Sequence, residues 1–213
     1  NTGSPKVRIS YAITCQASQV PHYFDSDPAV GSETASFDVV LPDAAFTLTT
    51  DRGVFSHGHL DTGTAVLLRE APVPPSTGDL LDLGCGAGAI ALTLALRSPG
   101  ATVWAVDVNV RARELTALNA ARRGVGNVRV SAPDEVPADV EFAAIWSNPP
   151  IRIGKAALHE LLLRWFGRLT PDGAACIVVQ KHLGADSLQA WLTHEGFPTT
   201  RIASRQGFRV LES

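Results

Sequence analysis

The sequence has few cysteines and no excess of basic residues, and each of these shortages excludes some classes of function. Its 213 residues include only Cys15, Cys85 and Cys176, which lie far apart and form no CxxC pair. This spacing argues against a disulfide framework or a zinc site and favours a reducing compartment, so we expect a cytoplasmic protein. With 18 Lys and Arg against 21 Asp and Glu, the net charge is −3. Most nucleic-acid-binding domains are strongly basic, so any such contact would depend on a local basic patch.

Long apolar runs are also absent. No stretch reaches the roughly 20 apolar residues that span a bilayer, and the N-terminus has no basic segment followed by an apolar one, as a secretory signal would. We therefore expect no membrane partner. His57 and His59 resemble a metal-binding pair, but no further ligand has suitable spacing, so we expect no metal site. The 45% hydrophobic and 18% charged residues are typical of a globular chain with a buried core.

Residues 1–70 are predicted to form a β-rich extension of a larger domain at 71–213. Residues 1–21 show no period and are expected to be a loose lead-in. Strand-like and helical patterns follow, at 37–41, 45–49 and 53–55 for strands and at 62–70 for a helix capped by Thr62 or Thr64. The first two strands flank Pro42-Asp43, which is typical of a hairpin. A Pro- and Ser-rich connector at 71–78 marks the boundary.

From residue 79 onward, strand and helix patterns alternate. Strands are predicted at 79–82, 102–107, 128–131, 142–147, 174–180, 199–203 and 208–211, and helices at 88–97, 110–123, 155–168 and 187–194. Pro171-Asp-Gly173 is expected to turn the chain into the fifth strand, and the last two strands to form an antiparallel hairpin. This order predicts an α/β fold with a Rossmann-like, doubly wound, mostly parallel seven-stranded sheet. Ligands of such folds bind beyond the carboxyl ends of the strands.

A glycine-rich turn follows the first of these strands. Asp82-Leu-Gly84-Cys85-Gly86-Ala-Gly88 has the spacing GxGxG after an acid, and not the dinucleotide fingerprint GxGxxG. Glycines permit a tight turn and a close approach of the backbone to a ligand. A carboxylate at Asp82 would repel a pyrophosphate placed at the following helix N-terminus. It suits a cofactor that carries an ammonium group and a sulfonium instead.

Asp107 ends the next strand, 25 positions after Asp82. A carboxylate there can accept hydrogen bonds from both hydroxyls of a ribose. NAD-binding and S-adenosylmethionine-binding folds share this placement, so Asp107 supports a nucleoside cofactor without choosing between them. Softer cofactor contacts are expected from Val108, from Asp134 at an adenine amino group, and from Asp61 and Thr64 at the amino-acid end. Asp134 fits a solvated acidic residue of a loop equally well. Thr64 fits a helix cap equally well.

The string Asn148-Pro149-Pro150 follows the fourth strand, at the same edge of the sheet. An exocyclic amine of a purine, or a carboxamide nitrogen, is a poor nucleophile because its lone pair is delocalised. If the Asn148 side-chain oxygen and the backbone carbonyl of Ser147 or Pro149 accept its two N–H bonds, the lone pair is directed towards a methyl group. The prolines fix the backbone and preorganise these acceptors. We therefore expect Asn148, Pro149 and Pro150 to be the catalytic residues.

Neighbouring residues are candidates for substrate contacts. They are Ile151, Arg152, Lys155, Phe55, Lys181 and His182. Arg152 and Lys155 carry the charge needed to hold phosphates, although two cations also fit a solvated surface. A basic patch is expected from three arginines of the terminal hairpin, Arg201, Arg205 and Arg209.

With these motifs in view, the sequence resembles class I S-adenosylmethionine-dependent methyltransferases. More narrowly, it resembles the small-domain family related to the bacterial small-subunit ribosomal RNA guanine-N2 methyltransferase. The landmarks occur in the family's order: Gly53-Val-Phe-Ser56, Leu60-Asp-x-Gly63-Thr64, Asp82 through Gly88, Asp107, Asn119 and Asn148-Pro-Pro150. Over residues 50–180, the resemblance implies cofactor contacts at Asp82 through Gly88 and at Asp107. It implies contacts with the substrate amine at Asn148 and Pro149.

The sequence departs from this family in two respects. The additional N-terminal methyltransferase-like domain of the family's best-known member has no counterpart in the 213 residues. Ile151 stands where an aromatic residue usually stacks on a flipped base. Ile151 can still act as a wedge, and Phe55 or Trp146 are candidates to replace the aromatic ring.

We expect an enzyme that transfers a methyl group from S-adenosyl-L-methionine to the exocyclic amine (N2) of a guanine in ribosomal RNA, as a monomer or homodimer. The alternative acceptor is a protein glutamine amide or a small molecule, because the Asn-Pro-Pro acceptors suit an amide nitrogen equally well. An NAD-dependent oxidoreductase is disfavoured by Asp82 and by the absence of GxGxxG. A non-catalytic interaction module is disfavoured because Asp82, Asp107 and Asn148 are all present.

Overall fold

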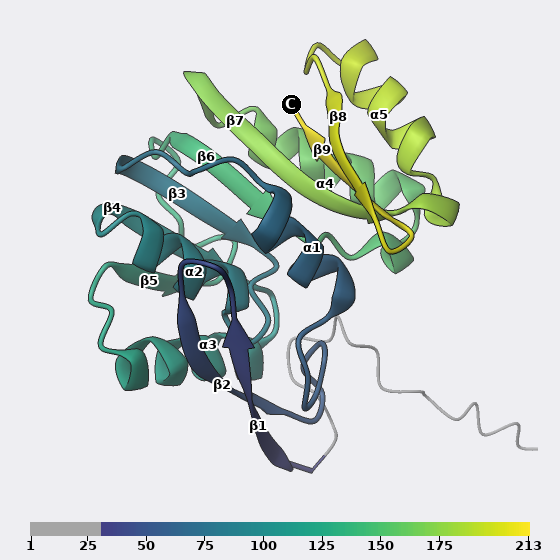
Figure 1. Cartoon of the computed structure of the whole chain (residues 1–213). Coiled ribbons are helices and arrows are strands. Elements are labelled where there is room, and N and C mark those ends of the chain that lie inside the picture. The colour runs from purple at the N-terminus through teal and green to yellow at the C-terminus, as the bar shows by residue number, and fades with distance from the viewer. Residues whose placement is uncertain (1–30) are drawn as a thin grey trace, which may run out of the picture.

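The computed structural model describes residues 31–213, which form a mixed sheet with helices on both faces (Figure 1). Across the sheet, the strand order is β5 (Val128–Ser131), β4 (Gly100–Val106), β3 (Thr77–Leu83), β6 (Phe142–Ser147), β7 (Leu169–Gln180), β9 (Phe208–Glu212) and β8 (Thr200–Arg205). The first five strands are parallel, and β9 is antiparallel to both of its neighbours. The predicted Rossmann-like fold with seven strands and an antiparallel terminal hairpin is confirmed. Residues 1–21, including Cys15, lie outside the described part.

Helices cover both faces of this sheet. One core contains residues of α1 (Thr62–Glu70), α2 (Ala89–Arg97) and α3 (Val110–Arg123). The opposite core contains residues of α4 (Lys155–Phe166) and α5 (Ala185–His194). The side chains of β3 face both cores, because Leu80 packs in the first core while Leu81 and Leu83 pack in the second. A central parallel strand buries both sets of alternating side chains, and Leu80 and Leu81 are accordingly 0% exposed.

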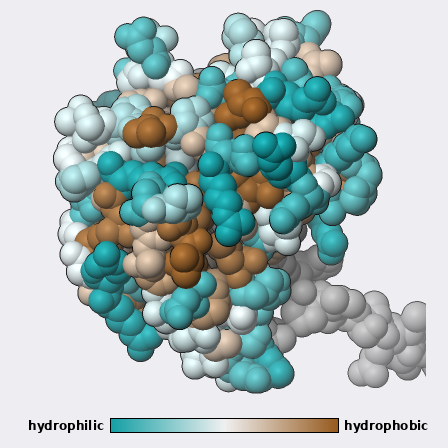
Figure 2. All heavy atoms as spheres, in the orientation of Figure 1, coloured by the Kyte–Doolittle hydropathy of each residue, from teal (hydrophilic) through white to brown (hydrophobic). Residues whose placement is uncertain are grey.

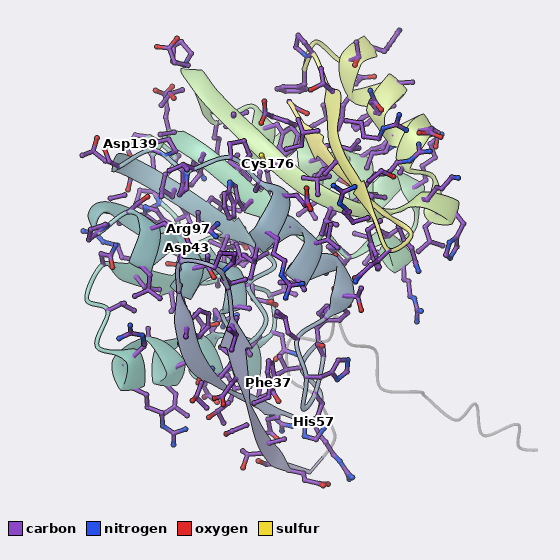
Figure 3. All side chains as sticks on the ribbon, viewed as in Figure 1. Phe37, Asp43, His57, Arg97, Asp139 and Cys176 are labelled. Carbon is purple, nitrogen blue, oxygen red and sulfur yellow. The ribbon has the colours of Figure 1, made fainter. Side chains whose placement is uncertain are left out.

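A separate hairpin of β1 (Thr34–Val40) and β2 (Ala45–Asp51) packs beside α3, as Figure 1 shows, and confirms the predicted hairpin. Asn119 on α3 holds its edge, because Asn119 Nδ2 donates to the Thr49 carbonyl at 2.8 Å and its Oδ1 accepts from the Thr49 N–H at 3.0 Å. The same Nδ2 donates to the carbonyl of Ala87 in the glycine-rich turn at 2.9 Å. At the tip, Arg97 of α2 pairs with Asp43 at 2.7 Å (Figure 3). The hairpin is thereby tied to the glycine-rich turn and to α2.

Two local predictions about the segment after the hairpin are wrong. Residues 53–55 form a turn and not a third strand, because Gly53 has a φ of +81° and the Val54 N–H donates to the Asp51 carbonyl at 3.2 Å. Helix α1 spans the predicted residues, but its N-cap is Asp61 and not Thr62 or Thr64. The Asp61 side chain accepts from the Thr64 N–H at 2.9 Å, as an N-cap carboxylate does.

The turn predicted at Pro171-Asp-Gly173 is also wrong, because these residues lie within the long strand β7. Phe142 of β6 pairs with Leu169, and the next pair joins Ala144 to Ala174. The register therefore shifts, and the extra residues of β7 form a bulge. Proline has no N–H for the ladder, which explains its position at this irregularity. The bulge lies at the start of the β6–β7 pairing and leaves the carboxyl ends of both strands regular.

Figure 2 shows apolar atoms in several separate places on one face, with polar atoms between them. Three of the large apolar side chains that the fold leaves exposed, Phe55, Val108 and Leu183, line one cavity that is described below. Within residues 31–213, no helix has the length and apolar character that a membrane span requires.

Candidate active site

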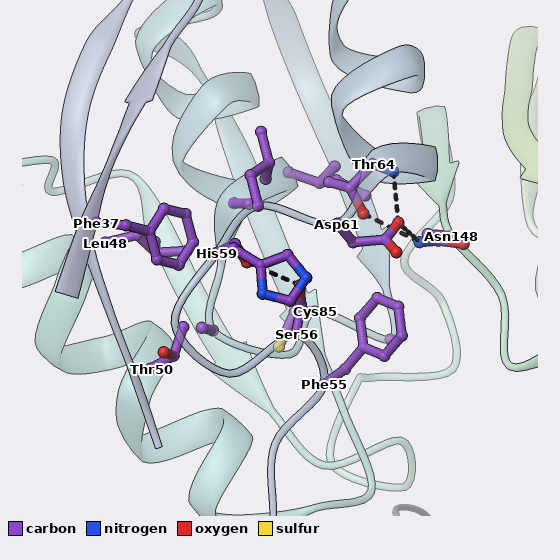
Figure 4. A pocket seen from close by; sticks show the side chains of 15 residues that line it. Phe37, Leu48, Thr50, Phe55, Ser56, His59, Asp61, Thr64, Cys85 and Asn148 are labelled. Atoms are coloured by element: carbon purple, nitrogen blue, oxygen red, sulfur yellow. Dashed lines mark hydrogen bonds between the residues drawn. The ribbon is translucent and has the colours of Figure 1, made fainter. Parts of the chain in front are cut away.

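A cavity of about 520 Å³ lies at the carboxyl edge of the sheet, a volume in the range of small-molecule sites. Its walls include residues that directly follow or end the parallel strands, namely Gly84 after β3, Asp107 and Val108 after β4, Asn148 after β6 and Gln180 in β7. A smaller cavity of about 40 Å³ adjoins it (Figure 4). Four residues line both cavities: Phe55, Asp61, Gly84 and Asn148. Thr64 and Cys85 line the smaller one.

The glycine-rich turn leaves open space at the cavity. Gly84 has a φ of +78°, a conformation that side chains of L-residues rarely adopt. A Cβ at Gly84 would meet no atom within 4 Å, so the backbone is open to a ligand there. Gly88 has a different role, because its Cβ would lie 3.0 Å from Thr116 of α3. Glycine at this position therefore permits close packing of α2 against α3. Gly86 lines neither cavity and donates its N–H to Asp107 at 2.9 Å.

Asp107 presents a carboxylate at the wall of the large cavity. Its Oδ2 accepts from the Gly86 N–H and its Oδ1 from the Asn109 N–H, each at 2.9 Å. Burial raises the pKa of Asp107, and these two hydrogen bonds oppose that effect. Each carboxylate oxygen has further acceptor capacity. The expected contact with two ribose hydroxyls is compatible with this geometry and stays a prediction.

Asp82 is buried, with 0% of its surface exposed, and lines neither cavity. Its Oδ2 accepts from the Ala91 N–H in α2 at 2.8 Å, while its Oδ1 has no hydrogen-bond partner within the described residues. Burial raises the pKa of Asp82 to about 8. The carboxyl group thus anchors the glycine-rich turn to α2, and its direct contact with a cofactor stays a prediction.

Asn148 is held by the start of α1. Its Nδ2 donates to Asp61 Oδ2 at 2.8 Å and to Thr64 Oγ1 at 3.0 Å (Figure 4). A carboxylate only accepts hydrogen bonds, so the Asn148 amide must turn its nitrogen towards Asp61. Its oxygen therefore points away from that contact, and no described residue donates to it. Asp61 and Thr64, which we expected at the amino-acid end of a cofactor, thus position the Asn148 side chain.

The backbone after Asn148 is also fixed. Pro149 is buried, and its carbonyl accepts from the Ile151 N–H at 2.8 Å. The 3-10 helix η1 (Ile151–Ile153) begins directly after Pro150. The Pro149 carbonyl keeps a second acceptor site, and its pairing with the Asn148 oxygen as acceptors of a substrate amine stays a prediction. Of the predicted substrate contacts, Phe55, Ile151 and Arg152 line the large cavity together with Pro149 and Pro150.

Besides Asp82, Gly86 and Gly88, four further predicted site residues lie outside both cavities. The Asp134 side chain is exposed and pairs with Arg164 at 3.0 Å, although its neighbour Pro133 lines the large cavity. Lys155 is exposed at the first position of α4. Lys181 and His182 are exposed in the 3-10 helix η2 (Lys181–Leu183).

Two further expectations need correction. Trp146 is 2% exposed and packs in the core, so it cannot stack on a substrate ring. Arg209 is 6% exposed and pairs with Asp186, so it cannot belong to a surface patch. Arg205 pairs with Glu70 at 3.3 Å and stays exposed. Among residues 31–213, no three His, Cys, Asp or Glu side chains form a group that could hold a metal ion.

Gln180 and Phe208 are cavity residues that the sequence motifs did not indicate. Gln180 ends β7 and Phe208 begins β9, and the two are paired in the antiparallel register. Both line the large cavity. Ligands of this fold bind at the carboxyl ends of parallel strands, and this rule indicated Asn148. Gln180 also ends a parallel strand, so the same rule could have indicated Gln180. Phe208 reaches this edge only because β9 runs antiparallel beside β7.

The sheet order, the glycine-rich turn and the carboxylate after β4 define a class I methyltransferase fold. The family model described as "Methyltransferase small domain" matches residues 45–212, and the chain belongs to this family. It is an S-adenosylmethionine-dependent methyltransferase, as the sequence resemblance implied. Membership of this family excludes two alternatives considered from the sequence, an NAD-dependent oxidoreductase and a non-catalytic interaction module.

Individual relatives match to different extents. "Uncharacterized protein YbxB" of Bacillus subtilis is 34% identical over 195 residues, which cover 90% of this chain and 97% of YbxB. "Ribosomal RNA small subunit methyltransferase C" of Pseudomonas aeruginosa is 33% identical over 213 residues, 98% of this chain and 63% of that protein. The solved Thermus thermophilus 16S rRNA N2 G1207 methyltransferase (RsmC), in complex with AdoMet and guanosine, aligns with a TM-score of 0.71 at 23% identity. That alignment covers 87% of this chain and 52% of RsmC. The chain thus spans nearly all of YbxB but only about half to two thirds of the named ribosomal RNA enzymes.

Proposed function

We propose that the protein methylates the exocyclic amine (N2) of a guanine in small-subunit ribosomal RNA. The observation that carries this proposal is the Asn148 amide, whose nitrogen is held by Asp61 and Thr64 while its oxygen stays available as an acceptor. Two relatives support a guanine of ribosomal RNA as the acceptor. One is named as a small-subunit ribosomal RNA methyltransferase, and RsmC was solved in complex with guanosine.

The residues at the carboxyl edge fit the methyl donor. S-adenosylmethionine supplies an electrophilic methyl group on a sulfonium when it is bound. Gly84 leaves open space beside the turn, and Asp107 offers a carboxylate for hydroxyl groups. The exposed apolar side chain of Val108 offers a surface for an adenine ring. We therefore assign Gly84, Asp107 and Val108 to the donor side of the cavity.

The acceptor side is built around Asn148. Its Oδ1 and the Pro149 carbonyl accept the two N–H bonds of the amine, which directs the nitrogen lone pair towards the methyl group. Because the Asp61 contact and the prolines already fix these oxygens, little reorganisation is needed in the transition state. The methylated nitrogen carries a positive charge and then releases its proton to water. Apolar side chains of the cavity, among them Val178 and Phe208, limit access of bulk water.

A protein glutamine amide is the second candidate acceptor. Among the described residues that line the two cavities, Arg152 is the one Lys or Arg. This low positive charge favours an uncharged amide over a phosphate-bearing RNA as the acceptor. Ribosomal RNA would therefore meet most of its cationic contacts outside the cavity, at exposed residues such as Lys155 and Lys181.

The test is incubation with S-adenosylmethionine labelled on its methyl group and with separated pools of small-subunit ribosomal RNA, protein and metabolites. We expect label in the RNA, and N2-methylguanosine after digestion to nucleosides. In Asn148→Ala, we expect transfer to fall by about 10², the scale for losing a preorganised polar group. S-adenosylhomocysteine should still raise the Tm of this variant. Label found only in protein would overturn the RNA acceptor and favour the glutamine amide.

A further inference from the structure

Gln180 is a polar residue in an apolar part of the large cavity. Its neighbours on this wall include Val178, Leu183 and Phe208. Gln180 is half-buried, and among residues 31–213 no group hydrogen-bonds its side-chain amide. In contrast, the amide nitrogen of Asn148 and both carboxylate oxygens of Asp107 have partners within the protein. An amide that loses water when a ligand enters costs free energy unless the ligand supplies hydrogen bonds.

We propose that Gln180 selects guanine as the acceptor, by hydrogen-bonding the ring edge next to the methylated amine. Its Nε2 donates to O6 of the base, and its Oε1 accepts from N1–H. This inference rests on the proposed function and adds a specificity-determining residue to it.

The strand register places Gln180 at a suitable distance from Asn148. Ser147 pairs with Ile177, so the same register sets Asn148 opposite Val178, and Gln180 lies two residues further along β7. Two residues of extended strand span about 7 Å, and neighbouring strands lie about 5 Å apart, so the two backbone positions are about 8 Å apart. A purine edge with a hydrogen bond of about 2.9 Å at each end covers a similar length. One base can therefore reach the Asn148 oxygen and the Gln180 amide together.

Phe208 adds a flat surface beside Gln180. The two residues are cross-strand partners, and the Phe208 ring packs closely on Gly63 of α1. An aromatic ring at this place can hold a purine in one plane, which supports stacking at a site where Ile151 replaces the usual aromatic residue.

The donor and acceptor pattern of the base explains the selectivity. Along one edge, guanine presents its amine, then the N1–H donor, then the O6 acceptor. Once Asn148 and Pro149 accept from the amine, a side-chain amide matches the remaining donor and acceptor together. 2-Aminopurine keeps the amine but lacks both N1–H and O6. A site that hydrogen-bonds a substrate group strongly rejects an analogue that lacks it, because its own polar groups are then left unpaired.

Binding of guanosine and 2-aminopurine riboside tests the inference. The protein is first saturated with S-adenosylhomocysteine, so that neither nucleoside can enter the donor side. Calorimetric titration then gives both Kd values for the wild type, for Gln180→Leu and for Gln180→Glu. Gln189→Leu is the matched control, because Gln189 lies on α5, lines neither cavity and donates to the Thr199 carbonyl.

We expect the wild type and Gln189→Leu to prefer guanosine by at least about 10-fold, the scale of one or two unmatched hydrogen bonds. Gln180→Leu should lose most of this preference, whereas Gln180→Glu, whose carboxylate still accepts from N1–H but no longer donates to O6, should keep part of it. The affinity of both variants for S-adenosylhomocysteine should be unchanged. The unchanged affinity also shows that the variants are folded.

Equal binding of the two nucleosides by the wild type would overturn the inference, and so would a Gln180→Leu variant that keeps the wild-type preference. Formation of N2-methylguanosine in ribosomal RNA would leave the proposed function standing in either case. Methyl label confined to protein would instead overturn the proposed function, and the assignment of Gln180 with it.

Discussion

Asp61 accepts a hydrogen bond from Asn148 Nδ2 at 2.8 Å, and the same carboxylate oxygen caps α1 by accepting the Thr64 N–H at 2.9 Å. The two side chains are 87 positions apart in the sequence. The start of α1 therefore sets the direction of the amide at the end of β6. The orientation proposed for methyl transfer exists before a substrate arrives, because the protein itself occupies the amide nitrogen.

Removing the Asp61 carboxylate should impair turnover more than stability. Asp61→Ala loses the N-cap of α1, which costs about 0.5–2 kcal/mol of unfolding free energy. It also releases the Asn148 amide, so we expect turnover to fall by about 10². Asp61→Asn keeps an oxygen that can accept from both partners and should stay within a few-fold of the wild type. Single-turnover methyl transfer and urea denaturation measure the two effects. Wild-type turnover in Asp61→Ala would show that this contact does not position Asn148.

A methyl group at Gly84 should interfere with the donor. Gly84 has a φ of +78° and Gly124, at the end of α3, has a φ of +74°, and a Cβ would meet nothing within 4 Å at either position. Alanine at either glycine should cost about 1–2 kcal/mol of stability, because of the left-handed backbone. Only Gly84→Ala places its methyl group at the cavity, so the rise in Tm caused by S-adenosylhomocysteine should shrink in that variant alone. Equal rises in Gly84→Ala and Gly124→Ala would remove Gly84 from the donor site.

Asp82 should make stability depend on pH. Burial raises the pKa of Asp82 to about 8 in the folded protein, compared with an ordinary value of 3.8. Between these values the folded state keeps a proton that the unfolded state has lost. The contribution of Asp82 to stability is therefore fully present below the unfolded pKa and is lost as the pH rises through the folded pKa.

Asp82→Asn removes this titration and leaves Asp107 in place. We expect its free energy of unfolding to fall less than that of the wild type between about pH 5 and pH 8. Urea denaturation of both proteins across this range is the measurement. Parallel pH profiles would show that Asp82 titrates near its ordinary pKa in the folded state.

Gly63 and Phe208 should be energetically coupled. A Cβ at Gly63 would lie 2.8 Å from the Phe208 ring, so Gly63→Ala must displace that side chain. Overpacking of this kind costs about 1–3 kcal/mol. Combining Gly63→Ala with Phe208→Leu relieves the contact, and the double variant should lose at least about 0.5 kcal/mol less than the sum of the single losses. Additive losses in urea denaturation would show that the ring does not rest on Gly63.

The sequence allowed prediction of the parts of the site that depend on local order. Gly84 and Asn148 follow predicted parallel strands and Asp107 ends one, and parallel strands end at one edge of a sheet. The cavity accordingly contains all three.

The missed or misjudged residues depend on contacts between distant segments. Phe208 enters the cavity because β9 inserts between β7 and β8, and the sheet order is not written in any single segment. Asp61 was interpreted without its partner Asn148, since the pair forms only when α1 packs near the end of β6. Trp146 and Arg209 point into the protein, and the identity of a side chain alone does not reveal which face of its strand is buried.

The position of β9 also affects the order in which the two halves of the cavity are completed during synthesis. The donor side comes from one continuous stretch of chain, from β3 to the turn after β4. Phe208, beside Gln180, is made only after α5 and β8. A nascent chain that has emerged as far as Gln180 already carries every parallel strand but still lacks this aromatic ring. The place proposed for the methyl donor is therefore encoded ahead of the place proposed for the base, and β9 completes the second.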